Sequence, residues 1–224
     1  MVETSGDHGK AGPRANGRVF RWALAYDLLL RMIWLGSERI YREKTLEYAG
    51  IGTGESVLDV GCGTGTLALA AKRRVGPSGR VVGVDASPEM ISRARKKAAV
   101  AALDVDFQIA SSEALPFTEA TFEAVLSTTV LHCLADDARE PSIREMVRVL
   151  KPNGRLLLID FGGSAREKRS LIGHLRAHRD FDVLDLIPAF QRTGLIDLRS
   201  GPLGFSDLQF VIATRVADTS SRSE

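Results

Sequence analysis

The fold of this chain is constrained most by a short apolar stretch that enters a glycine-rich turn and is followed, one helix later, by a second apolar stretch ending on a carboxylate. Residues 57–65 read VLDVGCGTG, and residues 81–85 read VVGVD. A strand, a glycine turn, a crossing helix and an acidic strand end form the first half of a nucleotide-binding βαβ unit. Because a carboxylate has two acceptor oxygens, Asp85 can accept hydrogen bonds from both hydroxyls of a ribose. The pattern therefore predicts an α/β fold with a nucleoside site.

The spacing of the glycines indicates which kind of nucleotide binds. Glycine occupies the first, third and fifth positions of the turn, at Gly61, Gly63 and Gly65, where the backbone must turn tightly or approach a ligand. A dinucleotide fingerprint has glycine or alanine at the sixth position, which is Thr66 in this chain. The turn also lacks the Gly-Lys-Ser/Thr ending of a phosphate-binding loop, and residues 59–71 contain no basic residue. We expect a ligand with a ribose and an adenine but no phosphate; the alternative is a plain connecting turn.

The segment Asp59–Gly65 resembles motif I of the class I S-adenosylmethionine-dependent methyltransferases, and the resemblance extends from about Thr45 to Phe161. Within that class, the chain looks most like the ubiquinone/menaquinone-biosynthesis group (methyltransferase type 11). The resemblance implies a Rossmann-like, doubly wound, mainly parallel seven-stranded sheet covered by N-terminal helices. It also implies S-adenosyl-L-methionine as cofactor, and an enzyme that transfers the methyl group to a small-molecule or lipid-like acceptor by in-line displacement.

The same resemblance implies cofactor contacts at particular residues. Asp85 would hold the ribose hydroxyls, and Ala86 and Met90 would line the adenine. Asp59 would hold the cofactor's ammonium group indirectly, or else satisfy backbone donors at its strand end. Family members usually have an aspartate where this chain has Ser111, so the adenine contact would rest on that serine or on the backbone after it, unless Ser111 is a plain strand end. The full expected set is Asp59, Gly61, Cys62, Gly63, Gly65, Asp85, Ala86, Met90, Ser111, Ser112, Glu113, Ser127 and Tyr26.

One histidine is the candidate catalytic base, which is needed if the acceptor must lose a proton. His132 follows the fourth predicted strand, and ligands of open α/β sheets bind at the carboxyl ends of the strands. The competing interpretation is a histidine packed at the start of a helix. His174 and His178 lie four residues apart, but no third ligand accompanies them, so we expect no metal site.

Apolar periodicity predicts alternating strands and helices from Val57 onward. The predicted strands cover residues 57–60, 81–85, 105–109, 123–128, 156–160, 196–199 and 208–215, and the predicted helices cover 19–35, a stretch ending near 49, 65–75, 88–102, 139–150, 165–179 and 184–193. Disordered tails are expected at 1–18 and 217–224. Residues 19–216 are expected to form a single methyltransferase domain, made of N-terminal helices (19–50), a cofactor-binding core (55–162) and C-terminal helices with closing strands (163–216).

Composition argues against several classes of protein. The formal net charge of +2 over 224 residues is too small for a nucleic-acid-binding surface. The two cysteines, Cys62 and Cys133, cannot form a disulfide framework and are expected to be free thiols of a reducing compartment. No apolar run reaches the roughly 18 residues that span a bilayer, and no signal peptide is visible, so we expect a cytoplasmic protein. We expect it to be a monomer or a homodimer. The aromatic N-terminal helix, with Tyr26, would form an acceptor lid, a membrane-surface contact or a cover of the core.

Two other functions stay open. A catalytically silent module could bind S-adenosylmethionine without turnover. A nicotinamide-dependent oxidoreductase would need glycine at the sixth position of the turn and a Tyr-x-x-x-Lys pair, which Tyr41–Lys44 does not match. An enzyme that methylates amino groups of DNA or RNA would carry Asn/Asp-Pro-Pro-aromatic after the fourth strand, where this chain has Ser127–Val130. A small-molecule or lipid-like acceptor is therefore the leading expectation.

Overall fold

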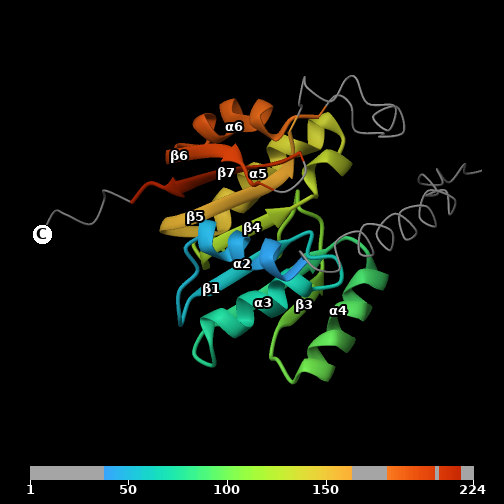
Figure 1. The fold of residues 1–224 in the computed structure, drawn as a ribbon. Coiled ribbons are helices and arrows are strands. Elements are labelled where there is room, and N and C mark those ends of the chain that lie inside the picture. The colour runs from blue at the N-terminus through green and yellow to red at the C-terminus, as the bar shows by residue number, and fades with distance from the viewer. Residues whose placement is uncertain (1–37, 163–180, 205–206, 218–224) are drawn as a thin grey trace, which may run out of the picture. The chain divides into compact units, whose positions relative to one another are not determined.

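A single sheet organises the part of the chain that the computed structural model describes, which is residues 38–162, 181–204 and 207–217. The chain divides after Ile40, and the sheet belongs to the part from Tyr41 onward. Within it, seven strands lie in the order β3-β2-β1-β4-β5-β7-β6 (Figure 1). The strands are β1 (Ser56–Val60), β2 (Arg80–Asp85), β3 (Asp106–Ile109), β4 (Phe122–Thr128), β5 (Leu150–Phe161), β6 (Leu195–Pro202) and β7 (Leu208–Arg215).

Strands β1 to β5 are parallel to one another, and β7 is antiparallel to both of its neighbours, β5 and β6. The chain adds strands outward from β1 to β3 and then returns, so that β4 lies beside β1 on its other side. Doubly wound sheets bind their ligands at this kind of switch point, outside the carboxyl ends of the strands. The predicted Rossmann-like, mainly parallel seven-stranded sheet is confirmed.

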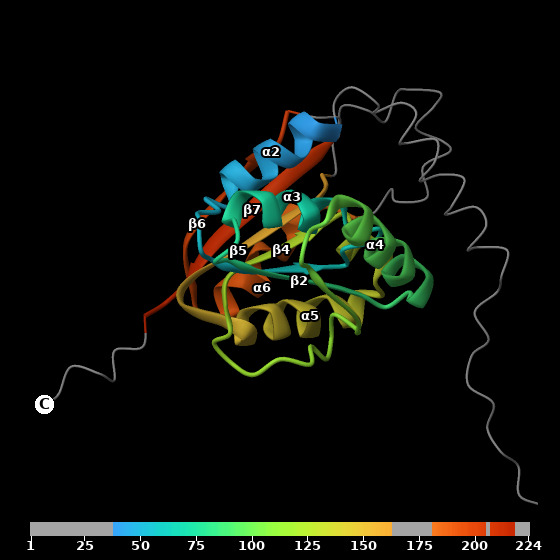
Figure 2. The ribbon, with the colours of Figure 1, turned by 90° about the horizontal axis from the view of Figure 1, so that it is seen from below.

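Helices cover both faces of the sheet (Figure 2). Helices α3 (Thr66–Val75) and α4 (Pro88–Ala101) lie on one face together with α2 (Glu38–Tyr48), whose Tyr48 ring is 4.4 Å from that of Phe210 in β7. Helices α5 (Asp136–Val149) and α6 (Ile187–Arg192) lie on the other face. Two short 3-10 turns, η1 (Leu131–Cys133) and η3 (Val183–Leu186), complete the described elements. None of the described helices is long and apolar enough to cross a membrane.

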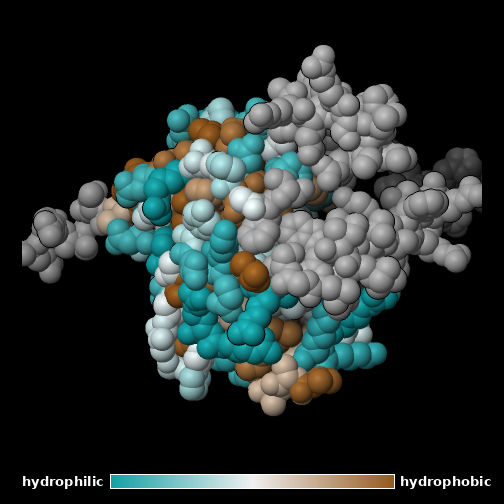
Figure 3. All heavy atoms as spheres, viewed as in Figure 1, coloured by the Kyte–Doolittle hydropathy of each residue, from teal (hydrophilic) through white to brown (hydrophobic). Residues whose placement is uncertain are grey.

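The central strands are apolar along most of their length because helices cover them on both faces. Leu58 and Val60 of β1, Val125 of β4 and Leu156 and Leu158 of β5 belong to one buried cluster. Hydrophilic side chains cover much of the face seen in Figure 3, with hydrophobic residues in small groups between them. Buried polar residues interrupt the apolar strands only near their carboxyl ends, at Asp59, Ser127 and Asp160. These three buried polar side chains indicate that a ligand site would lie at the carboxyl ends of the strands.

Several predicted boundaries differ from the observed ones. Helix α5 begins at Asp136 rather than at 139, and Pro141 lies inside it. Residues 151–154, between the helix predicted over 139–150 and the strand predicted over 156–160, belong to β5; there Asn153 has a φ of +62° and the pairing with β4 shifts register between Phe122 and Ala124. Pro188 lies in the first turn of α6, so it marks the start of that helix. The predicted helices over 19–35 and 165–179 and the predicted tails fall outside the described residues, apart from position 217.

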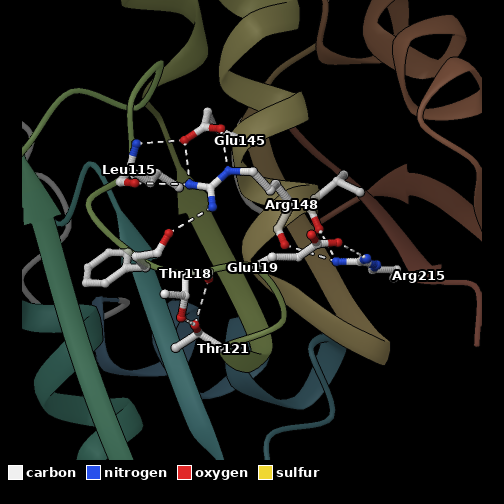
Figure 4. A network of polar contacts seen from close by, with 9 residues as sticks. Leu115, Thr118, Glu119, Thr121, Glu145, Arg148 and Arg215 are labelled. Carbon is white, nitrogen blue, oxygen red and sulfur yellow. Dashed lines mark hydrogen bonds and ion pairs between the residues drawn. The ribbon is translucent and has the colours of Figure 1, made fainter. Parts of the chain in front are cut away.

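Helix α5 anchors the segment that connects β3 to β4 (Figure 4). The Arg148 guanidinium donates to the carbonyl of Phe117 at 2.8 Å and to that of Leu115 at 3.0 Å. Glu145 pairs with Arg148 at 2.6 Å and accepts the amide hydrogen of Leu115 at 2.8 Å. One ion pair on α5 therefore satisfies three backbone groups of the connection, which holds that segment in place after β3.

We expect Arg148→Ala to lower the free energy of unfolding by about 1–3 kcal/mol, because two backbone carbonyls lose a charged donor. Urea denaturation monitored by circular dichroism measures the change. Arg144→Ala is the matched control on the same helix, since Arg144 makes an exposed ion pair with Glu140 at 2.9 Å. That control should cost less than about 1 kcal/mol. Equal losses in the two variants would contradict the anchoring role of Arg148.

Candidate functional site

The glycine turn leaves β1 and enters α3 through three residues with left-handed backbone. Gly61, Gly63 and Gly65 have φ values of +72°, +53° and +76°, which residues with a side chain rarely adopt. The amides of Gly61 and Cys62 both donate to the carbonyl of Val84, at 2.8 and 2.9 Å. The turn is thereby bonded to the end of β2.

The three glycines have different surroundings. A Cβ at Gly61 would lie 2.2 Å from a methyl carbon of Val130, and one at Gly65 would lie 2.5 Å from the ring of Phe107. These two positions need glycine because protein atoms pack against them. A Cβ at Gly63 would meet no atom within 4 Å. At Gly63 the backbone faces open space, so a ligand can approach the main chain there.

Asp85, at the end of β2, accepts hydrogen bonds from two backbone amides. Its Oδ2 accepts from Gly63 at 2.9 Å, and its Oδ1 accepts from Ser87 at 2.9 Å. A carboxylate oxygen has a further lone pair, so ribose hydroxyls can add to these bonds. Ala86 is exposed next to this carboxylate, and Met90 is half-buried in the first turn of α4. Asp85 therefore has a structural task, holding the glycine turn, that its position in the sequence did not reveal.

Residues 111–113 lie beside the end of β2, because the amide of Ala110 donates to the carbonyl of Asp85 at 3.1 Å. Ser111 is exposed; its hydroxyl accepts from the amide of Glu113 at 3.3 Å and donates to that carboxylate at 3.4 Å. Ser112 is half-buried and donates to Ser142 of α5 at 2.9 Å, since the Ser142 hydroxyl itself donates to a backbone carbonyl. Ser111, Ser112 and Glu113 of the expected cofactor set thus follow directly after a residue bonded to Asp85, and Ser142 of α5 holds Ser112.

Asp59, near the end of β1, has a buried oxygen without a hydrogen-bond partner in the described part of the chain. The residue is 1% exposed, and the unpartnered atom is Oδ2. Burial raises the pKa of Asp59 to about 7; the Ala68 amide lowers it, the Asp85 carboxylate raises it, and Arg42 lowers it. An unsatisfied buried polar group costs about 1–3 kcal/mol, which a ligand of suitable charge would recover.

Ser127, 2% exposed in β4, is the second such residue, and its Oγ lacks a partner among the described residues. It pairs with Val60, whereas Asp59 pairs with Leu126. Because successive side chains of a strand point to opposite faces, Ser127 and Asp59 lie on opposite faces of the sheet. They are therefore separate features of the strand ends.

Tyr41 of α2 also reaches these strand ends. Burial raises the pKa of its phenol; the neighbouring Thr128 and Thr45 side chains lower that pKa, and the carboxylates of Asp160 and Asp59 raise it. Sequence patterns named Tyr26 as the aromatic residue nearest the cofactor, and that residue lies outside the described part. Tyr41 was missed because nothing in the helical pattern distinguishes a residue that covers the core from one that lies at the site.

Asp160, at the carboxyl end of β5 and 1% exposed, gathers the loop that follows β4. Its Oδ2 accepts hydrogen bonds from the amides of Val130, Leu131 and His132 at 3.1, 2.9 and 3.3 Å. Its Oδ1 lies 2.7 Å from Nδ1 of His132 and accepts from the amide of Phe161 at 2.9 Å. The sequence signal for this residue was an acidic side chain at the end of an otherwise apolar strand.

The His132 imidazole is held on both nitrogens. Its Nε2 lies 3.1 Å from Sγ of Cys133, and its side chain is 8% exposed and packs edge-on against Phe161. Burial by itself lowers the pKa of His132. The hydrogen bonds and charges of Asp160 and Cys133 raise it by more than burial lowers it, so the net pKa is about 9. The ring is therefore charged at neutral pH, and becomes a base only as the pH rises toward that value.

The glycine turn also receives a cation that the sequence spacing did not indicate. Lys97 of α4 donates to Oγ1 of Thr64 at 2.6 Å and to Oγ1 of Thr66 at 3.2 Å. The turn therefore lies next to a positive charge, although residues 59–71 contain no basic residue. The expectation of a phosphate-free ligand depends on the glycine spacing alone. No cluster of His, Cys, Asp or Glu in the described ranges could hold a metal ion, and His174 and His178 lie outside them.

Comparison with known proteins identifies what this arrangement resembles. Residues 57–154 match the family described as "Methyltransferase domain". The ubiquinone/menaquinone biosynthesis C-methyltransferase UbiE of Enterobacter sp. (strain 638) is 36% identical over 141 residues, which are 62% of this chain and 55% of that protein. The demethylmenaquinone methyltransferase of Thermus thermophilus is 38% identical over 136 residues, or 61% and 60% of the two chains. The chain thus spans somewhat more than half the length of these curated relatives.

Solved structures share the fold. A SAM-dependent methyltransferase from Aquifex aeolicus superimposes with a TM-score of 0.67 at 24% identity, covering 78% of this chain and 89% of that one. Phosphoethanolamine N-methyltransferase 2 of Haemonchus contortus, solved in complex with S-adenosyl-L-methionine, gives a TM-score of 0.64 at 20% identity, covering 78% and 52%. At these identities the likeness is one of fold.

Gly63→Ala and Gly61→Ala should affect stability and ligand binding differently. Both place a side chain in the left-handed region, at about 1–2 kcal/mol each. Gly61→Ala adds the clash with Val130, typically about 1–3 kcal/mol more. Gly63→Ala should remain folded and lose S-adenosylmethionine binding, because its methyl group enters the open space. Urea denaturation and calorimetric titration measure the two effects; unchanged binding by folded Gly63→Ala would contradict the assignment of that space to the ligand.

The His132–Asp160 pair should make stability depend on pH. The folded pKa of about 9 exceeds the ordinary value of 6.5, so the pair stabilises fully below pH 6.5 and its contribution is lost as the pH rises through 9. The native protein should lose up to about 3 kcal/mol more than His132→Gln between pH 6.5 and 9.5. Urea denaturation at the two pH values tests this, and parallel losses in both proteins would show that the histidine is not held as described.

Proposed function

We propose that this chain, whose residues 57–154 belong to the class I S-adenosylmethionine-dependent methyltransferases, transfers a methyl group from S-adenosyl-L-methionine to a small quinol-type acceptor. The observation that carries the proposal is the open backbone at Gly63 beside the carboxylate of Asp85. The acceptor class follows the names of the curated relatives, which act in ubiquinone and menaquinone biosynthesis or on demethylmenaquinone. The whole activity is a proposal because the match spans only part of those proteins.

The residues present fit this cofactor. A ribose requires hydrogen-bond acceptors, which Asp85 supplies at the end of β2, next to a stretch of main chain with open space beside it. The amino-acid end carries an ammonium, for which the unpartnered oxygen of Asp59 offers a complementary charge. When bound, S-adenosylmethionine supplies a methyl group on a sulfonium, which is already activated toward a nucleophile. The protein then has to align donor and acceptor, and alignment can contribute about 7–11 kcal/mol.

The acceptor side is formed by the loop after β4, which Asp160 holds through three amides. His132 presents Nε2 from that loop, at present in contact with the Cys133 thiol. A phenolic oxygen of the acceptor would replace the thiol there. Because the imidazole is charged at neutral pH, its role would be to donate a hydrogen bond to the acceptor oxygen, which favours loss of the phenol proton to solvent; the resulting phenolate has a more nucleophilic ring carbon than the phenol. After methyl transfer, that ring carbon would release its own proton to solvent. The base role expected from sequence would apply only toward pH 9.

The alternatives have less support. A nicotinamide-dependent oxidoreductase lacks its glycine spacing in this turn. A catalytically silent S-adenosylmethionine-binding module would use the same cofactor residues, but gives no reason for a charged histidine fixed at the strand ends by a buried carboxylate. Turnover separates this module from an enzyme.

A methyl-labelled cofactor tests the proposal. We expect the native protein to form S-adenosylhomocysteine and a labelled product with a demethylmenaquinol analogue, and much less with phosphoethanolamine. Asp85→Asn should weaken S-adenosylmethionine binding at least about tenfold by calorimetry, since hydrogen bonds to a charged acceptor contribute about 1.5–3 kcal/mol each. Asp104→Asn, an exposed aspartate away from the strand ends, is the control and should bind as the native protein does.

Two results would contradict the proposal. Native affinity in folded Asp85→Asn would remove the ribose contact. Tight cofactor binding with no methyl transfer to any quinol would favour the silent module.

A further inference from the structure

Cys133 forms a side-chain cluster with His132 and Asp160 in which the thiol has no part in the proposed methyl transfer. The Sγ of Cys133 lies 3.1 Å from Nε2 of His132, and Nδ1 of the same ring lies 2.7 Å from Oδ1 of Asp160. Because the carboxylate accepts the Nδ1 hydrogen, Nε2 and the sulfur share the remaining proton between them. A nucleophile within hydrogen-bond distance of a base that a third group orients is the arrangement of an activated nucleophile.

The thiol of this cluster is exposed, and the backbone that carries it is held on two sides. Asp160 accepts the amide hydrogens just before Cys133. Arg139 of α5 donates to the carbonyls of Leu131 at 3.1 Å and Leu134 at 3.2 Å, one on each side of the cysteine along the chain. A guanidinium therefore lies beside the segment that carries the thiol, and reactive cysteines are found in such electropositive, accessible surroundings.

The other cysteine of the chain has the opposite surroundings. Cys62 is buried in the glycine turn, and its pKa is raised by that burial and by the carboxylates of Asp59 and Asp85. A thiol in such a position stays protonated and reacts slowly. Cys62 is therefore an internal control for Cys133.

Aromatic rings border the cluster. The ring of Phe161 packs edge-on against that of His132 with 4.8 Å between their centroids, and the ring of Phe181 lies 6.3 Å away. This apolar surface beside a nucleophilic sulfur suits a planar, aromatic electrophile. The oxidised form of the proposed acceptor is such a molecule, because the ring carbon that is nucleophilic in a quinol is electrophilic in the quinone.

We propose that Cys133 is a covalent modification site for quinones that have an unsubstituted ring carbon, such as the oxidised form of the unmethylated acceptor. The inference rests on the proposed function, because it takes the acceptor to lie against His132. A quinol would be methylated in this site, whereas the corresponding quinone would be attached to the protein.

The addition needs no further reactant. The sulfur of Cys133 attacks the unsubstituted ring carbon, and a C–S bond forms while the ring double bond gives its electron pair to the conjugated carbonyl oxygen. That oxygen takes the proton on Nε2 of His132. The attacked carbon then releases its hydrogen as a proton, and the second carbonyl oxygen takes up one proton from solvent. The electron pair donated by the sulfur thus reduces the quinone, and the product is a quinol thioether.

The adduct would lie on the side of His132 where the acceptor oxygen is proposed to bind, so modification would prevent methyl transfer. Once a ring carbon carries a methyl group, it has no hydrogen to release, and attack there cannot give a quinol thioether. The modification therefore distinguishes the unmethylated quinone from one whose reactive carbons are all substituted.

Mass spectrometry of the full chain treated with 1,4-naphthoquinone tests the inference without methyl transfer. At pH 7 the native protein should gain one naphthoquinone, about tenfold faster than glutathione does, because an unactivated thiol is only a few per cent thiolate at that pH. Peptide mapping should place the adduct at Cys133 and not at Cys62. We expect no adduct with 2,3-dimethyl-1,4-naphthoquinone, and none with either quinone in Cys133→Ser. Asp104→Asn, exposed in the loop before β3, should react as the native protein does.

His132→Gln removes the imidazole and keeps a side-chain amide. In this variant the thiol should react about tenfold more slowly than in the native protein, close to the rate of glutathione, while circular dichroism shows a folded chain. A second measurement needs no change at the histidine. The ultraviolet absorbance of the native protein minus that of Cys133→Ser should show a thiolate at pH 7.

The outcomes separate this inference from the proposed function. Equal reaction rates in native protein and folded His132→Gln, an adduct mainly at Cys62, or the absence of a thiolate signal would each overturn the inference. Methyl transfer to a quinol with no adduct at Cys133 would overturn it and leave the proposed function intact. An adduct at Cys133 in a protein that methylates no quinol would overturn the proposed function while supporting the reactivity assigned to the thiol.

Discussion

The hydrogen bond from the Gly63 amide to the Asp85 carboxylate joins the end of β1 to the end of β2, and the site is arranged around it. The bond requires a turn that brings main chain, without side chains, against the second strand. In that turn Gly61 and Gly65 pack against protein atoms, whereas Gly63 faces open space. The carboxylate proposed to hold the ribose also holds the turn that would lie against the same ligand. Ligand binding and loop geometry therefore depend on one side chain.

Aspartates near strand ends are used in two ways in this sheet. Asp85 and Asp160 accept backbone amides of the loops beside them, which gives the donor side and the acceptor side defined shapes. Asp59 lies between them along the sheet and has an oxygen that no amide reaches. A carboxylate that accepts backbone amide hydrogens keeps a loop in place, and a carboxylate oxygen that no amide reaches can respond to a ligand. The direction in which the neighbouring backbone amides point, and not the depth of burial, distinguishes the two kinds of aspartate, because Asp59 and Asp160 are equally buried.

Sequence patterns predicted the strands and helices well where the determinants are local. Apolar periodicity and the glycine turn identified β1 to β4 and α3 to α4 to within one or two residues. The predicted strand began only at residue 156, after the left-handed Asn153, because such a residue looks the same in a sequence whether a strand stops or continues through it. Asp160, Tyr41 and Lys97 were missed, since each acts through residues about thirty or more positions away. The roles given to the cofactor residues stay predictions until a ligand is seen.

A crystal structure of the protein with S-adenosylhomocysteine is the most direct test of the arrangement around Gly63 and Asp85. We predict that both ribose hydroxyls lie within hydrogen-bond distance of Asp85, that the ligand's backbone-facing side fills the open space at Gly63, and that the ammonium lies on the side of Asp59. A ligand bound elsewhere, or one whose ribose makes no contact with Asp85, would contradict the account.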